Sequence, residues 1–167
     1  MMRAKLEEIL SQMTIDTLEK LAFMFAFPDE GEEGQPGDSM VAGSVSFKGP
    51  FSGTLIMTIS IEVLQELAAN MLGLDDGEET TEDHRSDALR ETMNVICGNL
   101  LPAIAGDEVI FDVGVPEVLP ADQEMKKGAG IPDGLEPSAR VNLDLDEGRC
   151  VLFLFLDGEI PKDVVPP

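Results

Sequence analysis

The sequence ARVNLDLDEGRCVLFLFL, residues 139–156, decides the fold class because it contains two strand patterns on either side of a turn. In its first half, apolar residues alternate with polar ones, which is typical of a strand with one buried face. The residues expected to face the core are Val141, Leu143 and Leu145. Glu147 and Gly148 should turn the chain, and the second half is apolar enough for a buried strand. This stretch therefore predicts an antiparallel β-hairpin.

A second antiparallel hairpin is predicted earlier in the chain, between residues 40 and 60. Its first strand alternates apolar residues with smaller or more polar ones, and Gly49-Pro50 marks the turn. Its second strand contains the run TLIMTIS, which is apolar enough to be buried. One further strand is expected over Val109–Leu119, and it should end at Pro116.

Apolar residues at helical spacing predict two helices around the first hairpin. The first helix occupies residues 4–26, its apolar face reaches Phe25, and Pro28 stops it. The second occupies Ile61–Leu72, with Ser60 as its N-cap. A third helix follows before the last strands, so the two hairpins are separated by a pair of helices.

This order of elements predicts an α+β fold, with a mostly antiparallel sheet and helices packed on one face. A chain of 167 residues suits a single domain over 1–167. We expect its core at 40–157, an acidic loop at 29–39, a long polar loop at 120–137 and an irregular, proline-rich tail at 158–167.

The composition is strongly acidic, with 33 acidic and 11 basic residues and a formal net charge of −22. Such a field repels nucleic acid and anionic membrane surfaces, so neither is expected as a partner. The first eight residues lack the apolar core of a signal peptide, and no apolar run reaches membrane-spanning length. The sequence therefore predicts a cytoplasmic protein.

Several kinds of chemistry are excluded by the residues present. Cys97, Cys150 and the single histidine, His84, form no metal-ligand pattern, so a structural zinc site is excluded, and the two cysteines are not expected to form a disulfide. One histidine in an acidic segment is a poor base for a Ser-His or Cys-His site. The sequence also contains no phosphate-binding G-x-x-x-x-G-K-[ST] loop.

The third helix, which opens at Thr80 or Thr81, has two unlike faces. At about 100° of rotation per residue, one apolar stripe is formed by Leu89, Met93, Ile96 and Leu100. The opposite side, which should face water, carries Asp87, Glu91, Asn94 and Gly98. Asparagine and glycine both lower helix propensity, glycine by about 1 kcal/mol relative to alanine, so helix stability does not explain their presence.

Structural explanations remain open for each of these residues. Glu91 and Asn94 are consistent with ordinary solvated surface, and Glu91 has Arg90 as a neighbour for an ion pair. Pro102 lacks an N–H and crowds the carbonyl of residue 98, so it should kink or end the helix. Gly98 would give room at that position.

The pattern Asp87-x-x-x-Glu91-x-x-Asn94 followed by Pro116 resembles the CheC/CheX/FliY family of chemotaxis phosphatases. In that family an Asp or Ser precedes E-x-x-N, and a proline follows some twenty-odd residues later, here one residue earlier than usual. The likeness extends to E-x-x-N-x-x-x-G-N, which includes Gly98, and to the turn of the first hairpin. It covers roughly residues 35–160. A single E-x-x-N is similar to CheX, whose members pair as homodimers.

This resemblance implies a phosphatase that hydrolyses the aspartyl phosphate of a phosphorylated CheY-like response regulator. Asn94 would orient the attacking water, and Glu91 would pair with the lysine of the regulator's active site. Asp87 would lie at the rim of the contact, and Gly98 would permit close approach. The chain itself would bind no metal or other cofactor, because Mg²⁺ is held by the regulator.

The resemblance also leaves a second function open, since a shared fold does not guarantee activity. A catalytically silent CheX-like binding or adaptor module would dock the same regulator without dephosphorylating it. Neither function identifies which regulator is bound, or whether the pathway controls motility.

Overall fold

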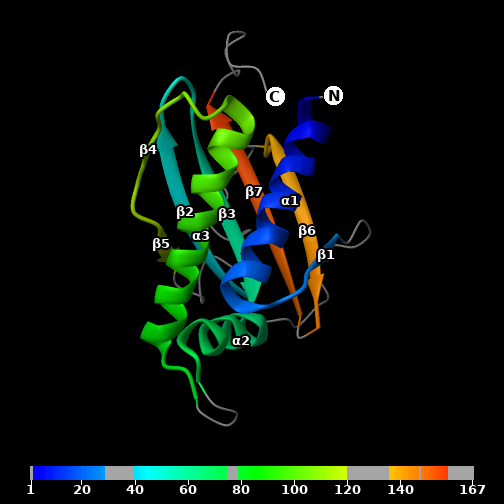
Figure 1. Ribbon diagram of the computed structural model, residues 1–167, viewed down its shortest axis with the longest axis vertical. Helices are drawn as coiled ribbons and strands as arrows, with labels where there is room; N and C mark the ends of the chain where they lie inside the picture. Colours follow the sequence, from blue (N-terminus) through cyan, green and yellow to red (C-terminus); the bar gives the residue numbers. More distant parts are fainter. Residues whose placement is uncertain (1, 29–39, 75–78, 120–135, 147, 158–167) are drawn as a thin grey trace.

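The computed structural model describes residues 2–28, 40–74, 79–119, 136–146 and 148–157. In these residues, helices pack against one open antiparallel sheet, so the predicted α+β class is confirmed (Figure 1). The predicted acidic loop, the proline-rich tail and most of the long polar loop lie outside the described residues.

Both predicted hairpins are present and form the centre of the sheet. The first consists of β2 (Met40–Lys48) and β3 (Ser52–Ser60), and the second of β6 (Ala139–Leu145) and β7 (Gly148–Asp157). They join through β3 and β7, and the strand order is β1-β6-β7-β3-β2-β4. The alternation in β6 is as expected, since its buried residues include Val141, Leu143 and Leu145.

The edges of the sheet differ from the prediction. The expected strand over Val109–Leu119 is instead two short strands, β4 (Asp112–Val113) and β5 (Glu117–Leu119), and both pair with β2. The pairing is interrupted before β5 because Pro116 has no N–H to donate. At the opposite edge, β1 (Phe27–Pro28) pairs with β6 and was not predicted.

The first helix is shorter at its C-terminus than the expected 4–26. Helix α1 covers Met2–Ala22, and Phe23 then takes a positive φ of 54°, which ends the helical path. The next residues extend toward β6, which leaves Phe25 62% exposed rather than in the core. The prediction that Pro28 stops this helix is wrong, because the helix has already ended at Ala22 and Pro28 lies in β1.

Helix α2 (Ile61–Leu72) has the expected bounds but a different start from the one predicted. The Ser60 side chain makes no cap hydrogen bond. Its hydroxyl oxygen accepts a hydrogen bond from the Arg149 N–H at 2.9 Å and donates to the Arg149 carbonyl at 3.1 Å. Ser60 therefore ties the start of α2 to strand β7. Gly73, in the left-handed conformation, ends the helix.

Helix α3 (Glu82–Ala105) is opened by one of the two expected threonines and continues through Pro102, which was expected to kink or end it. Thr81 is the N-cap, and its side chain accepts from the His84 N–H at 3.0 Å while the His84 ring accepts from the Thr81 N–H. Pro102 lies inside the helix, one turn from its end. The last turn persists because Ile104 is buried and Gly106 N–H bonds to the Pro102 carbonyl at 2.7 Å.

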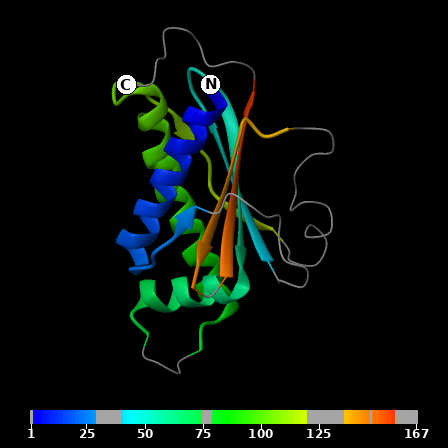
Figure 2. The ribbon, with the colours of Figure 1, turned by 90° about the vertical axis from the view of Figure 1, so that its right-hand side faces the viewer.

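The molecule has two layers, with α1 and α3 side by side on one face of the sheet and α2 across one end (Figure 2). The core lies between these helices and the sheet. Gly43 of β2 fixes the height of α3, because a Cβ there would lie 2.6 Å from the Met93 sulfur and 3.3 Å from a Leu89 methyl. The missing side chain lets α3 rest directly on the sheet.

Candidate functional site

Helix α3 presents the two faces that its sequence predicted. The apolar stripe is fully buried against the sheet and α1, and it consists of Leu89, Met93, Ile96 and Leu100. The residues on the opposite face are all exposed: Asp87, Glu91, Asn94 and Gly98. We call these four residues the polar stripe. It runs along the surface of the molecule, and the buried apolar stripe on the opposite face of α3 fixes the position of the helix.

The two central residues of the polar stripe have no partner among the described residues. Neither the Glu91 carboxylate nor the Asn94 carboxamide makes a hydrogen bond or an ion pair there. Arg90 pairs with Asp87 instead, at 3.2 Å between the guanidinium and carboxylate atoms. The ion pair between Glu91 and Arg90 is therefore absent from the described structure, and the Glu91 carboxylate is exposed to solvent.

The packing explanation for Gly98 also finds no support. A Cβ at this position would meet no side chain within 4 Å, so the Pro102 ring does not crowd it. Gly98 thus differs from Gly43, where Met93 occupies the space that a side chain would need. On α3, glycine at 98 leaves a flat, open point on the helix surface beside Asn94.

Pro116 lies beside α3 without joining the polar stripe. It is buried, and the carbonyl of its neighbour Glu117 would lie 3.3 Å from a Cβ on Gly43, the residue that also faces Met93. The chain around Pro116 therefore runs on the side of α3 that faces the sheet, and β5 contacts the helix there.

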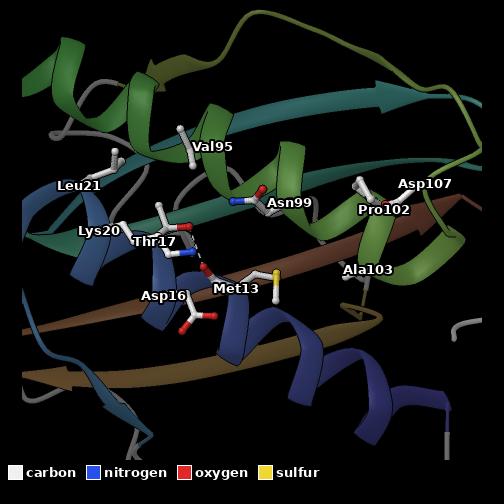
Figure 3. Close-up of a pocket in the computed structure, with 10 residues that line it drawn as sticks. All are labelled: Met13, Asp16, Thr17, Lys20, Leu21, Val95, Asn99, Pro102, Ala103 and Asp107. Carbon is white, nitrogen blue, oxygen red and sulfur yellow. Dashed lines mark hydrogen bonds between the residues drawn. The ribbon is translucent and has the colours of Figure 1, made fainter.

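The polar stripe is flanked by two hollows. A groove of about 660 Å³ separates α3 from α1 on one side (Figure 3). We call it the α1/α3 groove, and its lining residues are Met13, Asp16, Thr17, Lys20, Leu21, Val95, Asn99, Pro102, Ala103 and Asp107. A smaller hollow of about 370 Å³ lies on the other side, where Arg85 and Arg90 face α2, β2 and β5.

Sequence reasoning missed the part of this surface that α1 contributes. The α3 side of the groove was indicated by Asn99, the second residue of the G-N pair, because that residue lines the groove. The α1 residues gave no such signal, since their contact with α3 depends on the tertiary fold and not on local sequence.

The cysteines and the histidine of the chain supply no reactive group at the polar stripe. Burial raises the pKa of the Cys97 thiol to about 11, so it stays protonated and weakly nucleophilic at neutral pH, and burial also raises the pKa of Cys150. His84 serves in the helix cap. Across the described part of the chain, no three His, Cys, Asp or Glu side chains gather as a metal site would require. No described helix has the length and apolarity needed to cross a membrane.

The fold defines an α+β protein with an open antiparallel sheet and helices on one face, and comparison with known sequences gives the family. The sequence profile of the family described as "Chemotaxis phosphatase CheX" matches residues 41–130, more than half of the chain. The protein belongs to the CheX family. Among curated proteins, no sequence matches significantly.

Solved structures of this family share the fold across almost the whole chain. CheX from Vibrio vulnificus is 18% identical with a TM-score of 0.72, covering 93% of this chain and 98% of its own. CheX from Desulfovibrio desulfuricans is 18% identical with a TM-score of 0.70, covering 92% and 99%. A CheX–CheY complex with BeF₃ and Mg²⁺ from Borrelia burgdorferi contains a chain 19% identical, with a TM-score of 0.65 and coverage of 90% and 97%.

Proposed function

We propose that this protein is a phosphatase that accelerates hydrolysis of the aspartyl phosphate of a CheY-like response regulator. The observation that carries the proposal is the pair Glu91 and Asn94, exposed and unpartnered in the described structure on a helix of a CheX family member. The Borrelia burgdorferi structure, in which a CheX is bound to CheY with BeF₃ and Mg²⁺, supports a regulator as the partner.

Asn94 supplies what the hydrolysis of an acyl phosphate lacks, which is a water held in line with the breaking P–O bond. A carboxamide both donates and accepts hydrogen bonds, so it can fix the orientation of one water. Its amide has no competing partner in the described chain, and it projects from a helix that the buried Met93 and Ile96 hold in place. The water attacks phosphorus, the bond to the aspartyl oxygen breaks, and the regulator recovers its free carboxylate.

Glu91 fixes the depth and register of the docked helix. It lies about one turn before Asn94 on the same face, so both side chains reach the partner together. Its free carboxylate would pair with the lysine of the regulator's active site through a charge-assisted hydrogen bond. Asp87 lies at the rim of this contact, and Gly98 allows the partner's backbone to come close.

We also propose that the chain carries no cofactor of its own and that the only metal in the reaction is the Mg²⁺ of the regulator. The side chains assigned a role are one carboxamide, Asn94, and two carboxylates, Glu91 and Asp87. The protein would act in the cytoplasm, where it meets the regulator, and would do so as a homodimer.

The test is the loss of phosphate from a phosphorylated CheY-like regulator of the same cell, with Asn94→Ala and Glu91→Ala compared with the parent. Asn94→Ala should lower turnover by about 100-fold or more while binding is kept, because only the oriented water is lost. Glu91→Ala should weaken binding by about 10-fold as well as turnover, because it removes a charge-assisted hydrogen bond.

Glu62→Ala, at an exposed glutamate of α2, is the matched control and should behave like the parent. If no regulator of that cell is dephosphorylated but one is bound, the protein is an adaptor and the enzyme proposal fails. If Glu91→Ala and Asn94→Ala both match the control, the polar stripe is only solvated surface.

A further inference from the structure

The α1/α3 groove begins directly beside the polar stripe. Val95 and Asn99 form its α3 wall, and each follows a residue of the stripe, Asn94 and Gly98, in the chain. Each is rotated by about 100° around the helix from that residue of the stripe, so a body wider than the helix that sits on the stripe also lies over the mouth of the groove. Figure 3 shows the groove between the two helices, with Asn99 on one side and Thr17 and Lys20 on the other.

The polar stripe alone is too small to hold a folded partner. From Asp87 to Gly98 it is about 16 Å long, and a helix presents a width of about 10 Å, which gives about 160 Å². Even weak, transient complexes bury several hundred Å² on each partner. A regulator docked on the stripe must therefore cover at least one of the two flanking hollows.

The α1/α3 groove is the flank with more to gain from being covered. Its partly exposed apolar residues come from both helices: Met13, Leu21, Val95, Pro102 and Ala103. The smaller hollow also has partly exposed apolar residues, which come from β2, α2 and β5. It differs from the groove in its two guanidinium groups, which already have partners, since Arg90 binds Asp87 and Arg85 donates to Thr80. Removing apolar surface from water stabilises a complex, whereas covering charged groups also costs their desolvation.

The polar groups of the groove are consistent with a peptide segment as its occupant. The Asn99 amide makes no hydrogen bond with any described residue, so it can serve both the N–H and the C=O of a partner backbone. Asp16 and Asp107 outnumber Lys20 along the rim. Together with the net charge of −22, this favours a basic residue beside an apolar one.

We propose that the α1/α3 groove is the second half of the regulator-docking surface. It receives an apolar side chain of the receiver domain, next to a basic residue, and Asn99 binds the backbone at that point. This inference rests on the proposed function. It assigns affinity to the groove and leaves the orientation of water to Asn94, so the two can be separated by experiment.

The experiment fills the groove without touching the polar stripe. Ala103→Phe places a ring in the groove at a partly exposed position, so the helix should fold as before. Ala4→Phe, at an exposed alanine of α1 outside the groove, is the matched control. Affinity is measured by titration with the regulator loaded with beryllium fluoride and Mg²⁺, and turnover is measured separately with the phosphorylated regulator.

The expected result is that Ala103→Phe weakens binding by at least about 10-fold and raises KM with kcat unchanged, while Ala4→Phe matches the parent. Asn99→Ala should weaken binding by a smaller factor. If Ala103→Phe and Asn99→Ala bind like the parent, the groove proposal is overturned, even where Asn94→Ala abolishes turnover. If Asn94→Ala keeps full turnover, the proposed function fails, and the titration still decides whether the groove binds the regulator.

Discussion

Two glycines have opposite relations to their surroundings. Gly43 faces Met93 across a gap that a Cβ would close to 2.6 Å, so its missing side chain is required by packing. Gly98 faces open space, and no side chain of the described residues comes within 4 Å of a Cβ placed there. A glycine inside a helix costs about 1 kcal/mol relative to alanine. The exposed position of Gly98, one turn after Asn94, therefore points to a requirement outside the folded chain.

Gly98→Ala should make the protein more stable and less active. The free energy of unfolding should rise by up to about 1 kcal/mol, because alanine is the better helix former and its methyl group meets nothing. Turnover of the phosphorylated regulator should fall, because the methyl group holds the partner's backbone away from Asn94. Urea unfolding and a phosphate-release assay measure the two effects. Parent-like turnover would show that Gly98 has no role in close approach.

At the residue scale, the sequence predicted which side chains share a face, and it could not predict their partners. The polar stripe followed from the rotation per residue alone, and the burial of Leu89 and Met93 confirms it. The ion pair considered from the sequence, Arg90 with Glu91, joins chain neighbours that point apart on a helix, and Arg90 pairs with Asp87 one turn earlier instead. The groove beside Asn99 depends on an α1 far away in the chain, which local patterns do not place.

At the scale of elements, the contact between α3 and β2 sets where the polar stripe stands. Gly43 lets the helix rest on the strand, and Thr81 and His84 close its first turn with reciprocal hydrogen bonds. The ring cluster of Phe47, Phe51 and Phe111, with centroids 5.0 to 6.1 Å apart, fixes the other end of the same hairpin.

Gly43→Ala should therefore destabilise the protein and displace α3. We expect a loss of about 1–3 kcal/mol in the free energy of unfolding, because the new methyl group must push Met93 or the helix aside. Urea unfolding measures the loss, and Gly98→Ala is the matched control, since the same substitution there should act in the opposite direction. An unchanged free energy of unfolding for Gly43→Ala would mean that α3 can move away without cost.

The elements that were predicted correctly are those whose pattern is long and local. The hairpins β2–β3 and β6–β7 carry clear alternation and turn residues. The errors lie at element ends and edges. Helix α1 ends at Ala22 because Phe23 takes a left-handed conformation, and β1 exists only because β6 offers it an edge. Pro102 was expected to kink or end α3, and it does not end it, because the buried Ile104 holds one more turn.

At the scale of the whole molecule, the sheet is open at both ends of its strand order. One edge is β1, and the other is formed by β4 and β5 along β2. From Ala22 into β1 the chain alternates buried and exposed residues, and its exposed members are Phe23, Phe25 and Phe27. Exposed apolar residues gathered at one edge of a sheet are a common basis for association of identical chains.

The proposed homodimer gives a prediction that depends on this surface and on the charge. Two copies that each carry a net charge of −22 repel one another, so the fraction of dimer should rise with salt as the repulsion is screened. Light scattering over a range of protein and salt concentrations measures it, with Phe25→Ser as the variant and Lys5→Ser as a control on exposed α1 surface. A protein that stays monomeric at the highest concentrations would contradict the proposal.

The strand order itself could not be predicted from the sequence. The two hairpins are joined by pairing between β3 and β7, which are about a hundred residues apart in the chain, and no local pattern specifies that meeting. Composition, by contrast, predicted the overall charge directly.

The polar stripe stands between two hollows, so it forms a convex surface that can enter a partner protein and does not enclose a ligand. A helix with its side chains has a radius of about 5–6 Å, and this sets how far Asn94 can extend into another protein. A regulator would be a substrate only if its phosphorylated aspartate lies within that reach from its surface. The protein would then distinguish regulators by how deep the phosphorylated aspartate lies below the surface, because the length of the Asn94 side chain is fixed.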